Sequence, residues 1–193
     1  THPDAQWFPE AGLGLFMHWG IHSVAGIQPS WAMIKDYPAG ADPRFHPPDK
    51  YYALAKDFDP QNYDPDKWME AAAEAGFTYA VLTTKHHDGY ALWPTHFGDM
   101  STRQYMRGRD LLQPYVDACR RHGLKVGFYF SPVDWHYPGF PVGDVDFDYN
   151  KRGKHPQRDP EQNQKDFDAF YEYTIGQLAE LLTRYGKIDL LWF

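Results

Sequence analysis

The chain has 193 residues, enough for one domain of ordinary size, with a formal net charge of −7 and a pI near 5.7. This acidic balance argues against a nucleic-acid-binding protein, which needs a basic face. The single cysteine, Cys119, excludes an internal disulfide framework, and no apolar run approaches the roughly 18 residues of a membrane span.

Strand and helix patterns alternate along the chain. Short apolar runs predict four strands, at residues 14–19, 79–84, 125–131 and 188–193. Helical patterns lie between them, each followed by a glycine, at residues 64–75, 110–122 and 162–185. Strands that are apolar on both sides and alternate with helices are typical of a parallel sheet covered on both faces. Either a doubly wound sheet or a (β/α)8 barrel fits this order.

Polar residues gather where the predicted strands end. Two long stretches rich in proline and glycine follow the first and third strands, at 21–62 and 132–160. The run Lys85-His86-His87-Asp88-Gly89 follows the second strand. An imidazole titrates near neutral pH and can donate or accept hydrogen bonds, so two adjacent histidines indicate a site rather than packing. Barrel enzymes build their active sites at these strand ends.

Side-chain alternation along the strands predicts which residues share a face. Gly14 and Gly127 are small enough for the crowded inside of a barrel, and candidate rings lie on the same face as these glycines. Each ring alone is also compatible with ordinary packing, and only their common placement at strand ends favours a site. We therefore expect four rings to converge at the mouth of a barrel: His18, His86, Tyr129 and Trp192.

A metal site is the main alternative, and it needs three or four convergent ligands. The spacing from His18 to His22 differs from the His-x-His of barrel metallohydrolases, and His86 and His87 would point apart on a regular strand. The acidic run at 144–150 lacks the glycine and glutamate of a calcium loop. The remaining rings suit a polyhydroxylated ligand, because imidazoles bind hydroxyls and indoles stack on C–H faces. No metal and no cofactor is predicted.

Several segments, taken in order, carry a likeness to one enzyme family. They are residues 14–20, 63–68, 75–90, 127–131, 134–135 and 189–193. With these segments the chain resembles family 29 glycoside hydrolases, the retaining α-L-fucosidases, from about Trp7 to its last residue. The combination of His18-Trp19-Gly20 with the run at 85–89 is highly specific. The resemblance implies that residues 1–193 are the N-terminal portion of a (β/α)8 catalytic domain, truncated just after its fourth strand.

The resemblance also implies roles for individual residues. It makes His18, His86, His87 and Tyr129 binders of sugar hydroxyls, with Trp31 and Trp192 lining the pocket. The parent enzyme is expected to release terminal α-L-fucosyl, or related L-galacto-configured, residues from glycans with retention, through a covalent glycosyl–aspartate intermediate. The family's aspartate nucleophile would follow Phe193 and its acid/base lies further on. The chain alone is therefore expected to bind sugar weakly and cleave nothing.

One departure from the family concerns the first long loop, which commonly carries a Glu-Trp pair. This chain has Ser30-Trp31 instead. A serine cannot replace the family's glutamate as a carboxylate that binds sugar hydroxyls. Our hypothesis is therefore that the sugar preference is shifted toward an L-galactose-type sugar. The alternatives are a metal-dependent barrel hydrolase and a non-catalytic sugar-binding relative. A fucosylated glycan is the expected partner, with no nucleic acid and no membrane, and the resemblance implies an extracellular, periplasmic or lysosomal location.

Overall fold

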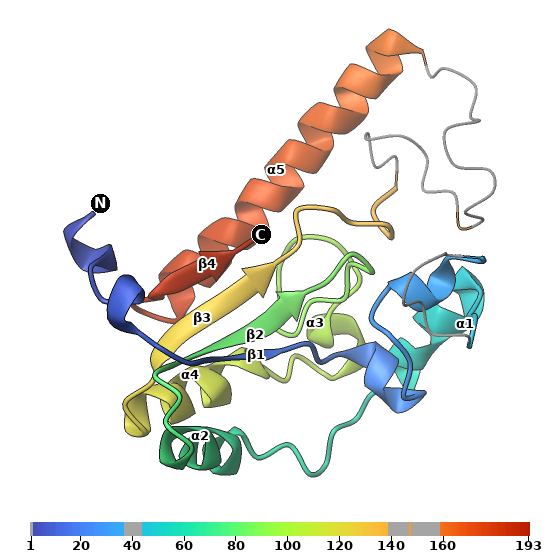
Figure 1. Ribbon diagram of the computed structural model, residues 1–193. Coiled ribbons are helices and arrows are strands. Elements are labelled where there is room, and N and C mark those ends of the chain that lie inside the picture. The colour runs from blue at the N-terminus through green and yellow to red at the C-terminus, as the bar shows by residue number, and fades with distance from the viewer. Residues whose placement is uncertain (1, 37–43, 139–146, 148–158) are drawn as a thin grey trace.

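The computed structural model describes residues 2–36, 44–138, 147 and 159–193. Its centre is a parallel sheet of four strands, which follow one another in chain order (Figure 1): β1 (Gly14–Met17), β2 (Tyr79–Lys85), β3 (Lys125–Phe130) and β4 (Leu190–Trp192). The four predicted strands are thus confirmed. The first and last are shorter than predicted, because Trp19 and Ile188 lie outside the paired segments.

The three predicted helices are also confirmed, as α2 (Pro65–Glu74), α4 (Leu112–Arg121) and α5 (Pro160–Arg184). The side chain of Asp64 accepts a hydrogen bond from the backbone N–H of Lys67 and caps α2, as expected of an aspartate before a proline. Further elements that the patterns did not predict lie before β1 and between the strands. These are α1 (Pro48–Ala53), α3 (Thr102–Tyr105) and the 3-10 turns η1 (Pro3–Ala5), η2 (Phe8–Glu10), η3 (Ile21–Val24), η4 (Trp31–Met33) and η5 (Leu54–Lys56).

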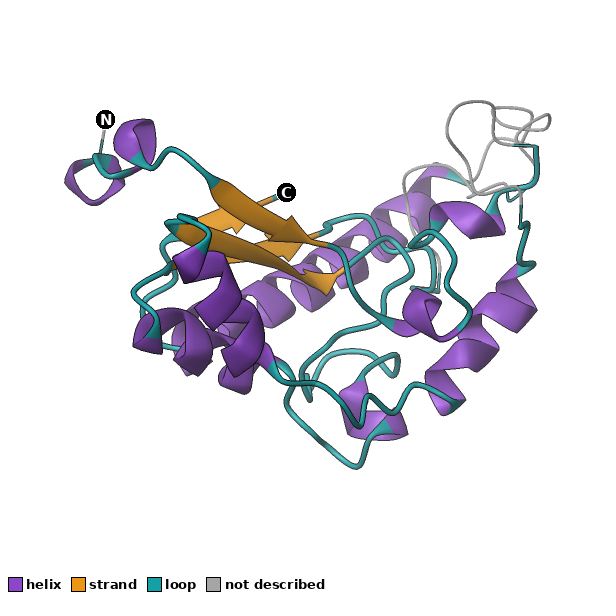
Figure 2. Ribbon diagram, turned by 60° about the horizontal axis from the view of Figure 1, so that its bottom comes forward, coloured by secondary structure: helices purple, strands orange, loops and turns teal. Residues whose placement is uncertain are grey.

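The longer helices run along one side of the sheet (Figure 2). Side chains of β2 and β3 on that side, such as Leu82 and Phe128, form the core with α2, α4 and α5. On the opposite side, Phe16 is 41% and Trp192 is 48% exposed. A doubly wound sheet carries helices on both faces, so the four described strands and their helices have the arrangement of one part of a (β/α)8 barrel. The predicted α/β class is confirmed. The central strands β2 and β3 are buried on both faces, as expected, whereas the edge strands β1 and β4 expose residues on the face opposite the helices.

The sheet register puts Phe16, Val81, Gly127 and Leu190 in one row across the four strands. A Cβ at Gly127 would lie 2.7 Å from the carbonyl oxygen of Ala80 and 2.8 Å from Cγ2 of Val81. The missing side chain therefore lets β3 approach β2 while Val81 fills the row.

None of the described helices has the length and apolar character needed to cross a membrane.

We expect Gly127→Ala to destabilise the protein by about 1–3 kcal/mol, because the added methyl group meets the backbone of β2 and forces the strands apart. The matched control is Gly176→Ala in α5. The atoms nearest to its methyl group belong to the side chain of Phe97, which is 36% exposed and can move, and alanine favours the helix by up to about 1 kcal/mol. Midpoints of urea unfolding of the full-length protein test this, and equal losses in both variants would contradict it.

Candidate functional site

The six candidate residues come together at the carboxyl ends of the strands, from five separate segments. The ring centroid of His18, just after β1, lies 5.3 Å from that of His86 and 5.2 Å from that of Tyr129. The ring of His87 lies 4.2 Å from that of His86 and 5.4 Å from that of Trp31 in η4. The sixth residue, Trp192 in β4, joins them through Phe16. We call His18, Trp31, His86, His87, Tyr129 and Trp192 the ring cluster.

Two aromatic residues belong beside the ring cluster although the sequence analysis did not select them. The ring of Phe16 lies 5.0 Å from that of His18 and 5.4 Å from that of Trp192. Its place on the same strand face as His18 could have identified it. The ring of Trp135 lies 5.3 Å from that of His87 and 5.4 Å from that of Trp31. Trp135 follows β3 in a loop without periodicity, where only the family likeness pointed to it.

His86 and His87 lie side by side, which corrects the expectation that they would point apart. That expectation assumed a regular strand, but β2 ends at Lys85 with a shift in its register against β3. The chain then turns, with the backbone N–H of Gly89 donating to the carbonyl oxygen of His86 at 3.0 Å. Gly89 has a φ of 81°, a left-handed conformation that favours glycine. The turn places both imidazoles in the ring cluster.

Ser30 lies behind His86 and is completely buried. Its Oγ lies 2.6 Å from Nδ1 of His86, donates to Oδ2 of Asp88 at 3.0 Å, and accepts from the backbone N–H of Asp88 at 2.9 Å. The Tyr51 hydroxyl also donates to Oδ2 of Asp88, at 2.8 Å. The residue that departs from the family pattern therefore supports a histidine from behind. Tyr51 comes from α1, and its part in this network has no signal in the sequence.

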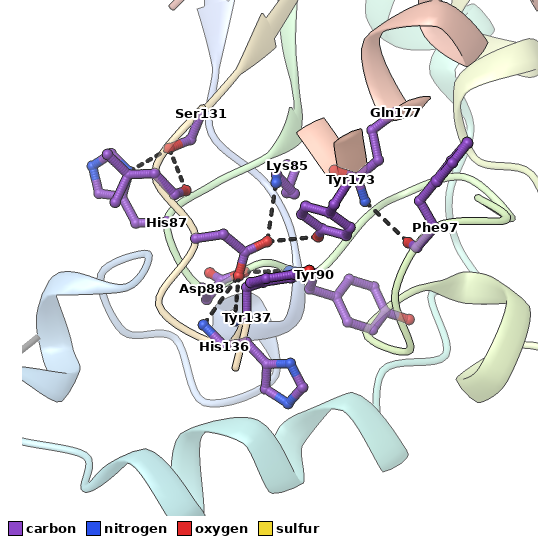
Figure 3. Close-up of polar contacts among 12 residues, drawn as sticks. Lys85, His87, Asp88, Tyr90, Phe97, Ser131, His136, Tyr137, Tyr173 and Gln177 are labelled. Atoms are coloured by element: carbon purple, nitrogen blue, oxygen red, sulfur yellow. Dashed lines mark hydrogen bonds and ion pairs between the residues drawn. The ribbon is translucent and has the colours of Figure 1, made fainter. Parts of the chain in front are cut away.

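His87 has a similar support from Ser131, which directly follows β3. Oγ of Ser131 lies 2.6 Å from Nδ1 of His87 and donates to the carbonyl oxygen of Val133 at 2.8 Å (Figure 3). Ser131 shares the strand face of Tyr129, so alternation could have placed it near the site. Each of the two adjacent histidines therefore has one ring nitrogen against a buried serine hydroxyl.

A buried ion pair joins the segments that carry the site. Nζ of Lys85 lies 3.0 Å from Oδ2 of Asp134, and their side chains are 0% and 1% exposed. The Tyr173 hydroxyl of α5 donates to the same oxygen at 2.7 Å, and Figure 3 shows Lys85 and Tyr173 pointing toward one acceptor. Burial raises the pKa of Asp134, but Lys85 and Tyr173 outweigh burial and hold the pKa below its usual value. Asp134 also accepts from the backbone N–H groups of His136 and Tyr137.

The histidines of the ring cluster are neutral at ordinary pH. Burial lowers the pKa of His86 to about 2, and the neighbouring His87 and His18 add to this effect. Burial likewise lowers the pKa of His87 to about 4, with His18 and Lys85 contributing. Burial also lowers the pKa of His18. A neutral imidazole has one donor and one acceptor nitrogen, which is what a hydroxyl-rich ligand requires.

The described residues contain no group of three or more histidine, cysteine, aspartate or glutamate side chains placed to hold a metal ion. The acidic run at 144–150 lies outside the described residues, except for Phe147.

Comparison with known proteins decides the family. The family model described as alpha-L-fucosidase matches residues 1–193. The chain belongs to the alpha-L-fucosidase family. The tissue alpha-L-fucosidase of Homo sapiens is 33% identical over 203 residues, covering 100% of this chain and 39% of the human protein.

Solved structures of this family agree with that result. Alpha-L-fucosidase isoenzyme 1 from Paenibacillus thiaminolyticus is 38% identical with a TM-score of 0.77, over 99% of this chain and 42% of that one. A trapped covalent intermediate of a GH29 alpha-L-fucosidase from Bacteroides thetaiotaomicron, in complex with 2-fluoro-fucosyl fluoride, is 28% identical with a TM-score of 0.77. It covers 100% of this chain, which matches 41% of that one. The chain thus spans about two fifths of the length of these relatives.

We expect the free energy of unfolding to fall as the pH drops below about 6.5, the pKa of an unfolded histidine. The folded pKa values of His86 and His87, about 2 and 4, are depressed, so the unfolded chain binds more protons. Each such histidine contributes a slope of up to about 1.4 kcal/mol per pH unit. Urea unfolding of the full-length protein between pH 7 and 5.5 should give a shallower slope for His87→Gln than for the wild type. An unchanged slope would show that His87 is not held neutral.

Proposed function

We propose that the protein carrying this chain is a retaining α-L-fucosidase that removes terminal α-L-fucosyl residues from glycans. In this proposal residues 1–193 are the N-terminal portion of its (β/α)8 catalytic domain and supply much of the sugar pocket. The observation that carries the proposal is the convergence of three neutral imidazoles with Tyr129 and two indoles, of which all but Trp31 lie within the segments that resemble the family.

The chemistry of the ring cluster supports a neutral, hydroxyl-rich ligand. His18, His86 and His87 can each exchange hydrogen bonds with hydroxyl groups without carrying a charge. The indoles of Trp31 and Trp192 offer apolar faces on which the C–H groups of a sugar can stack. Trp192 is 48% exposed and so has a face available to a ligand. Together these groups favour a sugar as the ligand, and the family match points to a fucosyl residue at the end of a glycan.

A retaining mechanism needs two carboxyl groups about 5–5.5 Å apart, one acting as nucleophile and the other as acid and base. The two buried acids beside the ring cluster, Asp88 and Asp134, are engaged with hydrogen-bond donors and with Lys85. We therefore assign neither catalytic role to them and propose an aspartate following Phe193 as the nucleophile. The Bacteroides relative, trapped as a covalent intermediate, supports a glycosyl–enzyme step.

We expect His86→Ala and His87→Ala to lower kcat/KM for nitrophenyl α-L-fucoside by roughly tenfold to a hundredfold, because each loses a hydrogen bond to the sugar. The control His96→Ala removes a ring that is 54% exposed and lies outside the cluster, and it should stay within about twofold. The assay uses the full-length protein, with product configuration followed by NMR. Inverted product, or no hydrolysis by the wild type, would contradict the proposal; sugar binding without hydrolysis would favour the non-catalytic alternative.

Ser30 at the family's glutamate position predicts a relaxed sugar preference. L-Galactose differs from L-fucose in carrying a hydroxyl at C6, and we expect kcat/KM values for nitrophenyl α-L-fucoside and α-L-galactoside to lie within about tenfold of each other. Parallel assays of the full-length enzyme measure this ratio. A clear preference for the fucoside would defeat the idea and leave fucosidase activity itself unaffected.

A further inference from the structure

His86 and His87 share one arrangement that goes beyond their place in the ring cluster. In each ring, Nδ1 lies 2.6 Å from the Oγ of a buried serine, Ser30 for His86 and Ser131 for His87. Neither Nε2 forms a hydrogen bond with any described residue. Which nitrogen carries the proton therefore depends on the direction of the serine hydroxyl.

The direction of the Ser131 hydroxyl follows from its second partner. Its Oγ lies 2.8 Å from the carbonyl oxygen of Val133. A carbonyl oxygen can only accept, so the single proton of Ser131 points to Val133. The distance of 2.6 Å to His87 is then a hydrogen bond in which Nδ1 of His87 donates to Oγ. His87 carries its proton on Nδ1, and its Nε2 has a free lone pair.

The hydrogen bonds between Ser30 and Asp88 likewise determine which nitrogen of His86 carries the proton. The Asp88 carboxylate accepts from the backbone N–H of Tyr90 at Oδ1, and from Tyr51 at Oδ2. The Tyr51 hydroxyl itself accepts the backbone N–H of Ser30 at 2.7 Å, so its own proton is directed to Asp88. The partners of this carboxylate are thus donors, and the Ser30 hydroxyl at 3.0 Å from Oδ2 donates as well.

One lone pair of the Ser30 Oγ accepts the backbone N–H of Asp88, which leaves a single lone pair. That lone pair lies 2.6 Å from Nδ1 of His86, so Nδ1 must carry a proton. Protonation of Asp88 would reverse the direction of both hydrogen bonds, because the acid would donate to Ser30 and Ser30 would donate to His86. The network therefore links the Asp88 carboxylate to the hydrogen bonding of the His86 ring.

We propose that Ser30 and Ser131 are positioning residues that hold His86 and His87 with the proton on Nδ1, so that both rings present Nε2 to the ligand as hydrogen-bond acceptors. The two ring centroids lie 4.2 Å apart, close enough for one small ligand to reach both. The pocket then selects ligands with two hydroxyl groups that can donate. The identity of the ligand as a fucosyl residue rests on the proposed function, whereas the tautomers do not.

Neutron diffraction from deuterium-exchanged crystals of the unliganded, full-length protein above pH 6 tests the tautomers directly. We expect deuterium on Nδ1 and none on Nε2 in both His86 and His87. Deuterium on Nε2 of either ring would overturn the proposal for that histidine, whatever the protein binds. In Ser131→Ala we expect the fixed Nδ1 position of His87 to be lost, because the alanine cannot accept its proton.

Binding of L-fucose to the same protein tests the consequence for the ligand. We expect Ser131→Ala to raise the dissociation constant about threefold to tenfold, the effect of one misdirected hydrogen bond, and Ser131→Thr, which keeps the hydroxyl, to stay within about twofold. Ser30→Gly should act like Ser131→Ala on His86, since glycine suits the φ of 57° at this position.

The outcomes separate the two proposals. Unchanged fucose affinity in Ser131→Ala and Ser30→Gly would overturn the positioning role. A wild type that carries deuterium on Nδ1 of both rings yet does not bind fucose would overturn the proposed function while supporting the tautomers. Loss of affinity in Ser131→Ala together with its retention in Ser131→Thr would support both.

Discussion

The arrangement of the site depends on the buried ion pair between Lys85 and Asp134. Both side chains are withdrawn from water, which costs several kcal/mol per ion unless their partners compensate for the lost hydration. Asp134 has that compensation, since it accepts from Lys85, Tyr173 and two backbone N–H groups. The pair therefore ties the end of β2 to the loop after β3 and to α5. Trp135 directly follows Asp134 and His87 lies two residues after Lys85, and these two rings contact each other.

The charged side chains next to the site are separated from the neutral side chains that can form hydrogen bonds with a ligand. The described charges next to the site, on Lys85, Asp88 and Asp134, are buried behind the rings and satisfied within the protein. The side chains that line the ring cluster are neutral, because burial depresses the pKa values of its histidines. A neutral lining with fixed donors and acceptors suits an uncharged polyol better than an anion or a metal ion.

Much of the fold could be predicted because it follows from local signals. Asp64 with Pro65 opened a helix, glycines closed helices, and apolar runs marked the four strands. The common placement of His18, His86, Tyr129 and Trp192 at strand ends also led to the correct expectation that they meet, although their roles in binding stay a prediction. The adjacent histidines were misjudged, since strand alternation does not apply beyond Lys85, where the chain turns at Gly89.

Periodicity and short motifs are properties of neighbouring residues, so they were enough to predict the parallel α/β arrangement, the family likeness and the six residues of the ring cluster. The residues that support those rings from behind were brought there by tertiary packing. Ser30 and Tyr51 contact Asp88 from positions 58 and 37 residues away. No local pattern encodes such contacts, because they arise when loops from different strands pack at the same end of the sheet. Packing therefore sets which ring nitrogen of His86 and His87 donates a hydrogen bond to a serine, whereas the sequence sets only that histidines stand at these positions.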